Sequence, residues 1–382
     1  MKRPKFLEMR RAEALIFMIC FIFIFGYIAH KMGTSHFIST MMNTSYKLLM
    51  DTAFYIMSIT ILSGALGKLL IEFGVVRLIE KILEPLMKPL YHLPGVASLG
   101  ALMTFLSDNP AIISLSNDRN FSKYFKKYQL VSLTNFGTAF GMGLVVIAFM
   151  TGIGYGKASL VGLLGAVVGS IISTRFMQYL VIRKYPAFKN EEVADNGNES
   201  KISFKSEGGI FIRFTDALLD GGKSGVTLGL QVIPGILLVS SFVMILTFGP
   251  GESGQYTGAA YEGVGLLPEL AAKANGVFSF LFGFSNPELT AFPITALGAV
   301  GAALGLVPKM QAEGLIDGNA IAVFTAMGMC WSGYLSTHTA MLDSLGYRGL
   351  TSRAIAAHTL GGIAAGISAH WFYVLASMLI AL

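Results

Sequence analysis

Seven stretches of this 382-residue chain are long and apolar enough to cross a lipid bilayer, and they constrain the fold more than any other feature. A bilayer-crossing helix needs about 20 mostly apolar residues. Only 13% of the residues are charged, against about 25% in a typical soluble protein. We therefore expect an all-α polytopic membrane protein. The expected spans are residues 13–30, 50–72, 128–152, 157–181, 224–249, 319–341 and 353–381.

Two further apolar stretches, residues 95–116 and 274–306, are each interrupted by an Asn-Pro pair. Each limb of the first stretch has about 11 residues, or about 16 Å of helix, which is half a membrane. We therefore expect re-entrant hairpins. Asn is a good N-cap and Pro suits the first helical position. Asn109-Pro110 and Asn286-Pro287 should each start a half-helix whose free amide groups and positive dipole end point into the membrane interior.

The distribution of basic residues predicts the orientation. With the N-terminus in the cytoplasm, all but five of the 28 Lys and Arg residues fall in cytoplasmic segments, as the positive-inside rule requires. The C-terminus is then outside. We expect a multi-pass protein of the bacterial cytoplasmic (inner) membrane. The five exceptions are Lys31, Lys47, Lys157, Lys273 and Lys309.

The order of spans and hairpins occurs twice along the chain. Residues 1–45 hold a cytoplasmic tail and the first transmembrane helix, and residues 46–182 form the first repeat. A polar cytoplasmic linker, 183–210, precedes the second repeat, 211–382. Three spans separate the repeat starts, so the second repeat is inverted, and its hairpin enters from the opposite face. Inverted repeats whose broken helices meet at the midplane are typical of secondary transporters; plain duplication in a structural membrane protein is the alternative.

Polar side chains concentrate on the hairpins and on the spans that follow them. An ionisable group at the bilayer centre costs about 2.5–3.5 kcal/mol, which favours a functional role. Helix capping by Asp108, a neutral carboxyl at Glu288 and simple packing of His338 are the structural alternatives. The predicted substrate-binding residues are Asn109, Asn135, Asn286, Glu288, Thr325 and His338, and the predicted ion-coupling residues are Ser107, Asp108 and Thr134.

Several classes of protein are excluded. No His-Glu-x-x-His or Gly-x-Ser-x-Gly motif occurs, so we expect no enzyme activity. Two Cys residues do not make a disulfide scaffold or a Cys-based zinc site, and short basic stretches between spans do not suggest nucleic acid. The expected partners are a small-molecule substrate and the lipid bilayer, with homo-oligomerisation left open. We expect no cofactor and no bound metal beyond a coupling ion, Na⁺ or H⁺.

Three segments carry a family resemblance. Leu83-Glu84-Pro85-Leu86, Ser285-Asn286-Pro287-Glu288-Leu289 and the stretch 333–348 resemble the nucleoside-recognition (Gate) domain, and the last resembles its YjiH-like members. The resemblance covers about residues 45–381. The chain is more distantly similar to spore maturation proteins A and B, to concentrative nucleoside transporters and to the membrane part of ferrous-iron transporters.

The resemblance implies a site in which two opposed hairpins and the helices after them hold the substrate, with sodium near the first hairpin. Ser285-Asn286-Pro287-Glu288 keeps the glutamate of the transporters' Gln-(Ser/Thr)-Glu-(Ala/Ser)-Pro motif but lacks the glutamine and the following proline. We therefore expect an ion-coupled secondary transporter of a small polar solute, nucleoside-like or amphoteric. One alternative is a metal or ion permease with soft ligands at Met327, Met329, Cys330 and His338; the other is a non-transporting membrane assembly factor.

Overall fold

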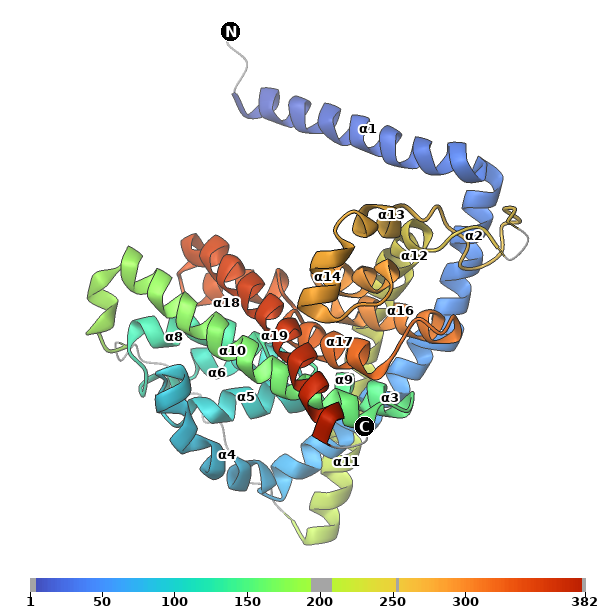
Figure 1. Cartoon of the computed structure of the whole chain (residues 1–382). Coiled ribbons are helices and arrows are strands. Elements are labelled where there is room, and N and C mark those ends of the chain that lie inside the picture. Colours follow the sequence, from blue (N-terminus) through green and yellow to red (C-terminus); the bar gives the residue numbers. More distant parts are fainter. Residues whose placement is uncertain (1–4, 194–207, 252–253, 380–382) are drawn as a thin grey trace.

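The computed structural model describes residues 5–193, 208–251 and 254–379, and side chains from residue 12 onward, with 14 residues of the expected linker (194–207) outside the described part. Every named element in it is a helix (Figure 1). Among the described residues, six helical runs are long and apolar enough to cross a membrane, and each begins within 16 residues of the start of an expected span. These runs are Ala12–Met32, Thr34–Glu72, Lys127–Gly152, Gly156–Lys184, Ile210–Thr247 and Arg348–Leu379.

Helices α3 (Phe54–Glu72) and α11 (Ile210–Pro234) form one tightly packed pair. Glycines allow the close approach: a Cβ on Gly64 would lie 2.5 Å from the carbonyl oxygen of Gly221. The Thr60 hydroxyl also donates to the Gly225 carbonyl at 2.8 Å. Small residues at helix contacts are how membrane helices pack closely without a hydrophobic driving force. Both helices continue through π-helical turns, α3 from α2 (Thr34–Lys47) through η1 (Leu48–Ala53), and α11 through η4 (Gly235–Ser240) into α12 (Ser241–Thr247).

The last long helices of the two repeats, α10 (Gly156–Lys184) and α19 (Thr351–Leu379), make the second tight pair. Gly169 and Gly361 face one another here, because a Cβ on either would lie within 2.8 Å of the other's carbonyl oxygen. Like α3 and α11, these two helices hold corresponding places in the two repeats. The inverted repeat therefore packs each long helix against its own counterpart.

The first hairpin is formed by α5 (Ala97–Leu106) and α6 (Pro110–Asn117), and Ser107-Asp108-Asn109 makes its tip. It follows α4 (Val75–Leu86) and η2 (Met87–Tyr91) and lies beside them (Figure 1). The Asn109-Pro110 pair thus begins the second half-helix, where the sequence places it.

The second hairpin differs from the expectation. Its first limb is η5 (Pro287–Thr290) with α15 (Ala291–Ala296), its second limb is α16 (Val300–Ala312), and its tip is Leu297-Gly298-Ala299. Asn286-Pro287 starts the first limb instead of the second. Pro suits the first position of any helix, so the pair marks a helix start without saying which limb it begins. Helices α13 (Leu266–Ala272) and α14 (Asn275–Phe282) precede this hairpin as α4 precedes the first.

Both spans that follow the hairpins are broken helices. The first is α8 (Lys127–Thr138) and α9 (Gly143–Gly152), separated by a turn in which Met142 has φ +54°. The expected continuous span 319–341 is α17 (Gly318–Cys330) and α18 (Ser336–Ser344). Gly333 in the intervening turn has φ +64°, which no α-helical residue adopts. Hydropathy averaged over 319–341 misses this break because the apolar residues of α17 dominate the average.

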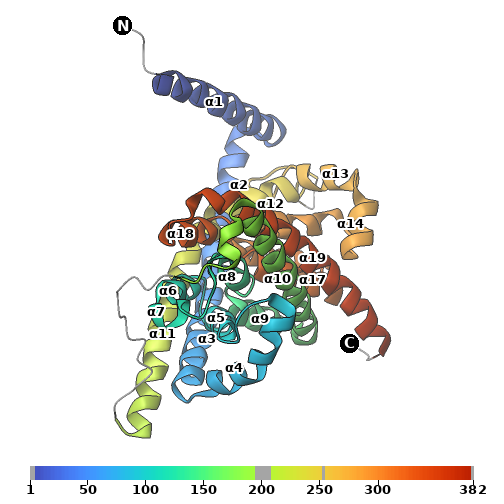
Figure 2. The same ribbon diagram turned by 90° about the vertical axis from the view of Figure 1, so that its left-hand side faces the viewer.

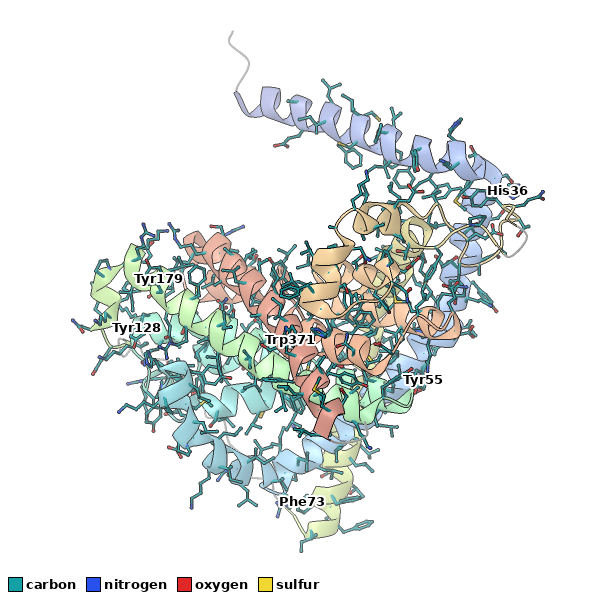
Figure 3. All side chains as sticks on the ribbon, viewed as in Figure 1. His36, Tyr55, Phe73, Tyr128, Tyr179 and Trp371 are labelled. Atoms are coloured by element: carbon teal, nitrogen blue, oxygen red, sulfur yellow. The ribbon has the colours of Figure 1, made fainter. Side chains whose placement is uncertain are left out.

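Helix α1 (Lys5–Met32) projects away from the rest of the protein (Figures 1 and 2). The outer faces of α1, α10 and α11 carry exposed apolar side chains that suit a lipid environment. Figure 3 shows Tyr179 of α10 and Phe73 after α3 at the periphery.

Short elements complete the described part of the chain: α7 (Arg119–Ser122), η3 (Pro186–Lys189) and η6 (Arg348–Leu350). The expected repeat boundary at residue 46 lies inside the continuous helix 34–72.

Candidate functional site

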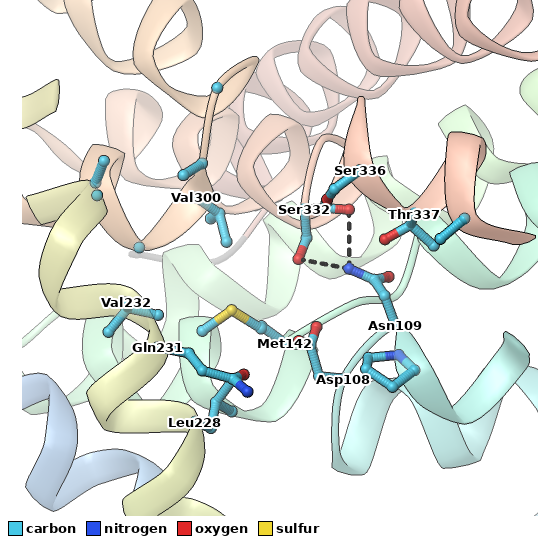
Figure 4. Close-up of a pocket in the computed structure, with 18 of the residues that line it drawn as sticks. Asp108, Asn109, Met142, Leu228, Gln231, Val232, Val300, Ser332, Ser336 and Thr337 are labelled. Carbon is cyan, nitrogen blue, oxygen red and sulfur yellow. Dashed lines mark hydrogen bonds between the residues drawn. The ribbon is translucent and has the colours of Figure 1, made fainter. Parts of the chain in front are cut away.

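A cavity of about 440 Å³ lies where the two hairpin tips meet the broken α17–α18 helix and α11. This volume is within the range of small-molecule sites, roughly 300–1,000 Å³. Hairpin one contributes Asp108 and Asn109, and hairpin two contributes Gly298 and Ala299. Figure 4 shows the first two with four other polar lining residues: Gln231, Ser332, Ser336 and Thr337.

Asn109 connects hairpin one to the break in the α17–α18 helix. Its side-chain amide donates to the Ser332 carbonyl at 3.1 Å and to the Ser332 hydroxyl at 3.3 Å (Figure 4). Two glycines make room for it. A Cβ on Gly333 would lie 2.5 Å from Asn109 Nδ2, and one on Gly141 would lie 2.4 Å from Asn109 Oδ1. The unwound segments of both post-hairpin helices therefore converge on this asparagine.

Two acceptor oxygens at the tip are left without protein partners. Asp108 Oδ1 and Asn109 Oδ1 are both inaccessible to solvent, and neither has a hydrogen-bond donor among the described residues. A buried acceptor without a donor costs about 1–3 kcal/mol. Asp108 also lines a second cavity of about 310 Å³ between hairpin one and the α3–α11 pair. The Asp108 side chain thus lies in the wall between two cavities.

The other predicted site residues on the hairpins lie elsewhere. Asn286 and Glu288, at the start of hairpin two, line neither cavity, and the segment that holds Glu288 packs against α13. Ser107 is exposed, lines only the second cavity and donates its hydroxyl to the Met103 carbonyl. The structure therefore does not bring Asn109 and Asn286 to a shared cavity.

Asn135 belongs to a buried network that does not line the central cavity. Its amide donates to Ser173 Oγ at 3.0 Å and to the Ala354 carbonyl at 2.9 Å. Ser173 lies 2.8 Å from His358 Nδ1, and His358 Nε2 contacts the Cys330 carbonyl. Since a carbonyl can only accept, His358 donates from Nε2 and accepts the Ser173 hydroxyl at Nδ1. This network joins α8, α10 and α19.

His338, Thr134 and Thr325 are fully buried and do not line the central cavity. His338 Nδ1 lies 2.6 Å from the Tyr334 carbonyl, and its ring centroid is 4.6 Å from that of His358. Thr325 faces α10, since a Cβ on Gly162 would approach its Cβ to 2.6 Å. Of the nine predicted site residues, the structure brings Asp108 and Asn109 together at the central cavity.

Residues that sequence reasoning left out of the site complete the cavity. Gln231 is a lone amide in the apolar run of α11, three residues before Pro234, and that isolation is the signal that could have found it. Ser336 and Thr337 lie in a polar run that the sequence shows, but their orientation depends on the helix break. Gly298 offers no polar side chain, so no signal distinguishes it from a packing glycine.

The described residues contain no group of three or more His, Cys, Asp and Glu side chains placed to hold a metal ion. Cys330, one of the soft ligands considered for a permease, is buried with its thiol 3.7 Å from the Ala166 carbonyl. The Met329 methyl group lies near Gly143 in α9. These contacts are ordinary helix packing.

Part of this chain is similar in sequence to known proteins. Residues 53–154, which include α3, hairpin one and α9, match a family described as Gate, nucleoside recognition. The sporulation integral membrane protein YlbJ of Bacillus subtilis (strain 168) is 35% identical over 88 residues, 22% of either chain. An uncharacterized protein of Alkalihalophilus pseudofirmus is 33% identical over 90 residues, 23% of this chain and 19% of its own. The matched region spans about a fifth of the length of these curated relatives.

Solved structures match over nearly the whole chain. CNTnw, a concentrative nucleoside transporter, in an inward-facing substrate-bound state gives a TM-score of 0.56 at 13% identity, covering 86% of this chain and 80% of the transporter. A variant of CNTnw in an outward-facing state also gives 0.56, at 11% identity, covering 98% and 88%. This chain shares the fold of CNTnw. The expected resemblance to the Gate domain and to concentrative nucleoside transporters is confirmed, as is the all-α multi-pass architecture.

Proposed function

We propose that this protein is an ion-coupled secondary transporter of a small polar solute, and that the central cavity is its solute site. The observation that supports this most is the pair of unpartnered oxygens, Asp108 Oδ1 and Asn109 Oδ1, at a cavity where both hairpin tips meet an unwound helix. Irregular backbone at membrane depth is tolerated where it is buried in protein or lines a polar cavity. In a transporter fold such a cavity is where a solute would bind.

The polar groups around the cavity indicate the chemistry of the solute. Hydroxyls of Ser336 and Thr337 and the amides of Asn109 and Gln231 can both donate and accept hydrogen bonds. Asp108 is the one ionisable residue among the described lining residues, and no lysine or arginine lines the cavity there. We infer that the solute is neutral or amphoteric with several hydroxyl or amide groups, and that a nucleoside-like molecule, as the name of the Gate family suggests, fits this description.

Asp108 is our candidate for the coupling ion, Na⁺ or H⁺. Its carboxyl lies in the wall between the two cavities, so binding a cation or proton there would change the charge next to the solute. We place the protein in the bacterial inner membrane, with the N-terminus in the cytoplasm and the C-terminus outside, because of the bias in basic residues.

Uptake into proteoliposomes tests this assignment. Asn109→Ala removes a donor and an acceptor at the tip, and we expect it to weaken uptake at limiting solute by roughly 3–10-fold. Asp108→Asn keeps the shape but removes the charge, and we expect it to abolish acceleration by an imposed Na⁺ or proton gradient. Before the variants are tested, the substrate is identified by measuring uptake of a panel of tritiated nucleosides and amphoteric solutes by the unmodified protein.

Glu288→Gln is the matched contrast, because Glu288 is also an acidic hairpin residue but lies outside the cavity. We expect it to leave uptake and ion coupling near those of the unmodified protein. Loss of coupling in Glu288→Gln, with normal coupling in Asp108→Asn, would move the ion site to the start of hairpin two and refute the assignment made here.

A second candidate function is a membrane factor in cell assembly that transports nothing. The local identity to the sporulation protein YlbJ favours it. The two functions separate in one experiment: the second predicts that no solute in the panel is taken up and that none raises the Tm of the purified protein.

A further inference from the structure

Two cavities flank the π-helical segment η2, and neither belongs to the central site. One, of about 440 Å³, is lined by Lys88 of η2 and by His92, which directly follows η2. Lys123 and Lys126, from the turn before α8, line it as well. The other, of about 280 Å³, is lined almost entirely by apolar side chains of α4, η2, α5, α8 and α10. We call the first the basic cavity and the second the apolar cavity.

Neighbouring residues of η2 line different cavities because of the geometry of a π-helical turn. A π-helix has more than four residues per turn, so side chains four or five apart share a face. Met87 and Tyr91 line the apolar cavity, while Lys88 and His92, one position further on, line the basic cavity. A single molecule lying across this segment can therefore contact a charged surface and an apolar surface.

Hydrogen bonds hold η2 in place from both sides. The Tyr91 hydroxyl lies 2.7 Å from Ser170 Oγ of α10, and Gln178 of the same helix donates to the Tyr91 carbonyl at 2.9 Å. On the other side, Gln129 of α8 donates to the His92 carbonyl at 2.7 Å. Both cavities are thus bounded by a fixed backbone.

The charge of the basic cavity favours an anion. Among the residues that the structure describes, three lysines and one histidine line it, against one acidic residue, Glu192. The neighbouring Lys127 is engaged with Glu191 at 2.6 Å and is not counted. Ammonium groups bind phosphate as point charges, and each basic residue near a membrane surface contributes about 1 kcal/mol to anionic lipid binding.

The helix before η2 indicates where the membrane surface lies. Leu78, Ile82 and Leu86 are four residues apart on α4 and are 66%, 70% and 44% exposed, so they form one outward apolar stripe. Lys81 lies on the same helix and is exposed as well. The helix also carries Arg77, Glu80 and Glu84, and an exposed apolar stripe with charged residues beside it is typical of a helix in the membrane interface. Figure 1 shows α4 at the edge of the protein.

We propose that η2 binds one anionic phospholipid, with its phosphate in the basic cavity and an acyl chain in the apolar cavity. The charge of the first cavity and the apolar lining of the second match the two ends of such a lipid. The apolar cavity is also lined by Ala101, Leu102 and Phe105 of α5, the limb that ends at Asp108-Asn109. The lipid would thus contact the hairpin that carries the central site.

Lipid titration of the purified full-length protein in detergent, followed by native mass spectrometry, tests the proposal. The probes are phosphatidylglycerol, phosphatidylcholine and glycerol 3-phosphate, the last having the phosphate without acyl chains. We expect phosphatidylglycerol to bind more tightly than either of the others. In Lys88→Ala/Lys126→Ala its apparent affinity should fall by about 30-fold, since two basic contacts are lost.

The matched control is Lys157→Ala/Lys189→Ala, which removes the same charge from exposed residues that lie outside both cavities. It should retain the affinity of the unmodified protein. Equal losses in the two double variants would show diffuse surface attraction and overturn the proposal. Binding of glycerol 3-phosphate as tight as that of phosphatidylglycerol would overturn it as well, because the site would then belong to a soluble phosphate.

Discussion

Single residues decide the geometry of the central site, and Asn109 is the most informative of them. Its side-chain nitrogen donates a hydrogen bond to the unwound segment after α17, and its side-chain oxygen has no hydrogen-bond donor in the described structure. The bridge depends on Gly333, whose φ of +64° turns the chain and whose missing side chain admits the asparagine. Glycine adopts this conformation freely, whereas other residues pay about 1–2 kcal/mol.

Gly333→Ala should therefore reduce both stability and uptake. The left-handed backbone conformation costs about 1–2 kcal/mol in the alanine variant. The new Cβ would also lie 2.5 Å from Asn109 Nδ2 and 2.3 Å from Thr337 Oγ1, so these side chains must move. We expect a lower Tm and a higher KM for uptake.

Gly346→Ala is the control, because Gly346 has φ +79° but nothing within 4 Å of an added Cβ. It should lower the Tm by less than Gly333→Ala, because only the backbone cost applies, and leave the KM unchanged. If the two alanine variants share the same KM, the contact between Gly333 and Asn109 does not shape the solute site.

The sequence predicts Asp108 and Asn109 correctly as hairpin-tip residues because capping rules act locally, and Asn109-Pro110 begins a helix wherever the rest of the chain lies. The same local rule fails at Asn286-Pro287, since a helix start does not reveal which limb it belongs to. Asn135, His338 and Thr325 are intramembrane polar residues as expected. The partners of Asn135 and the α10 neighbour of Thr325 lie more than 30 residues away along the chain, so the sequence cannot show that these two residues face packed helices.

At the scale of elements, the loop between α12 and α13 is fastened to α2 by one buried carboxylate. Glu262, 3% exposed, accepts hydrogen bonds from Thr257 Oγ1 at 2.6 Å and from the Gly258 amide at 3.0 Å, and Thr40 Oγ1 of α2 lies 3.5 Å away. Asn43 of α2 also donates to the Gly258 carbonyl. Burial acts to raise the pKa of Glu262, but the hydrogen bonds from residues 257–259 outweigh it and lower the pKa.

This lowered pKa predicts acid loosening of the loop. A carboxyl whose folded pKa lies below its unfolded value of about 4.3 stabilises the fold above that value and loses the contribution as pH falls through the folded pKa. We expect amide hydrogen exchange in residues 254–263 to be slow at pH 7. After correction for intrinsic rates, protection should fall below about pH 4.

Glu262→Gln provides the control. Its amide group cannot accept from all the donors that the carboxylate satisfies, so protection of residues 254–263 should already be reduced at neutral pH. Protection in this variant should then change little with acid. An unaltered acid transition in Glu262→Gln would assign the loosening to another group.

The points at which helices are interrupted are harder to predict from the sequence than the helices themselves. Hydropathy predicts the long helices well, since length and apolarity alone define them. It does not predict that 319–341 splits at Trp331–Leu335, because the apolar residues before the break dominate the average over the whole stretch. A backbone conformation at one glycine, set by tertiary contacts, makes the difference.

At the scale of the whole molecule, two helix pairs surround the hairpins. The α3–α11 pair and the α10–α19 pair each join corresponding helices of the inverted repeats through glycine contacts. The central cavity lies between the α3–α11 pair and the hairpin tips, and its lining comes from both repeats. We propose that movement of hairpins and broken helices against α3–α11 exposes this cavity to each side of the membrane in turn.

Cysteine accessibility from the two membrane faces tests this claim most directly. Ser336→Cys, in a Cys20→Ser background, places a thiol on the cavity wall, while the native Cys330 is buried. Ser377→Cys, exposed near the end of α19, is the fixed reference. With a membrane-impermeant maleimide applied to cells and to inside-out vesicles, alternating access predicts that Ser336→Cys reacts from both faces and Ser377→Cys from one. Reaction of Ser336→Cys from a single face, or from neither, would contradict the account.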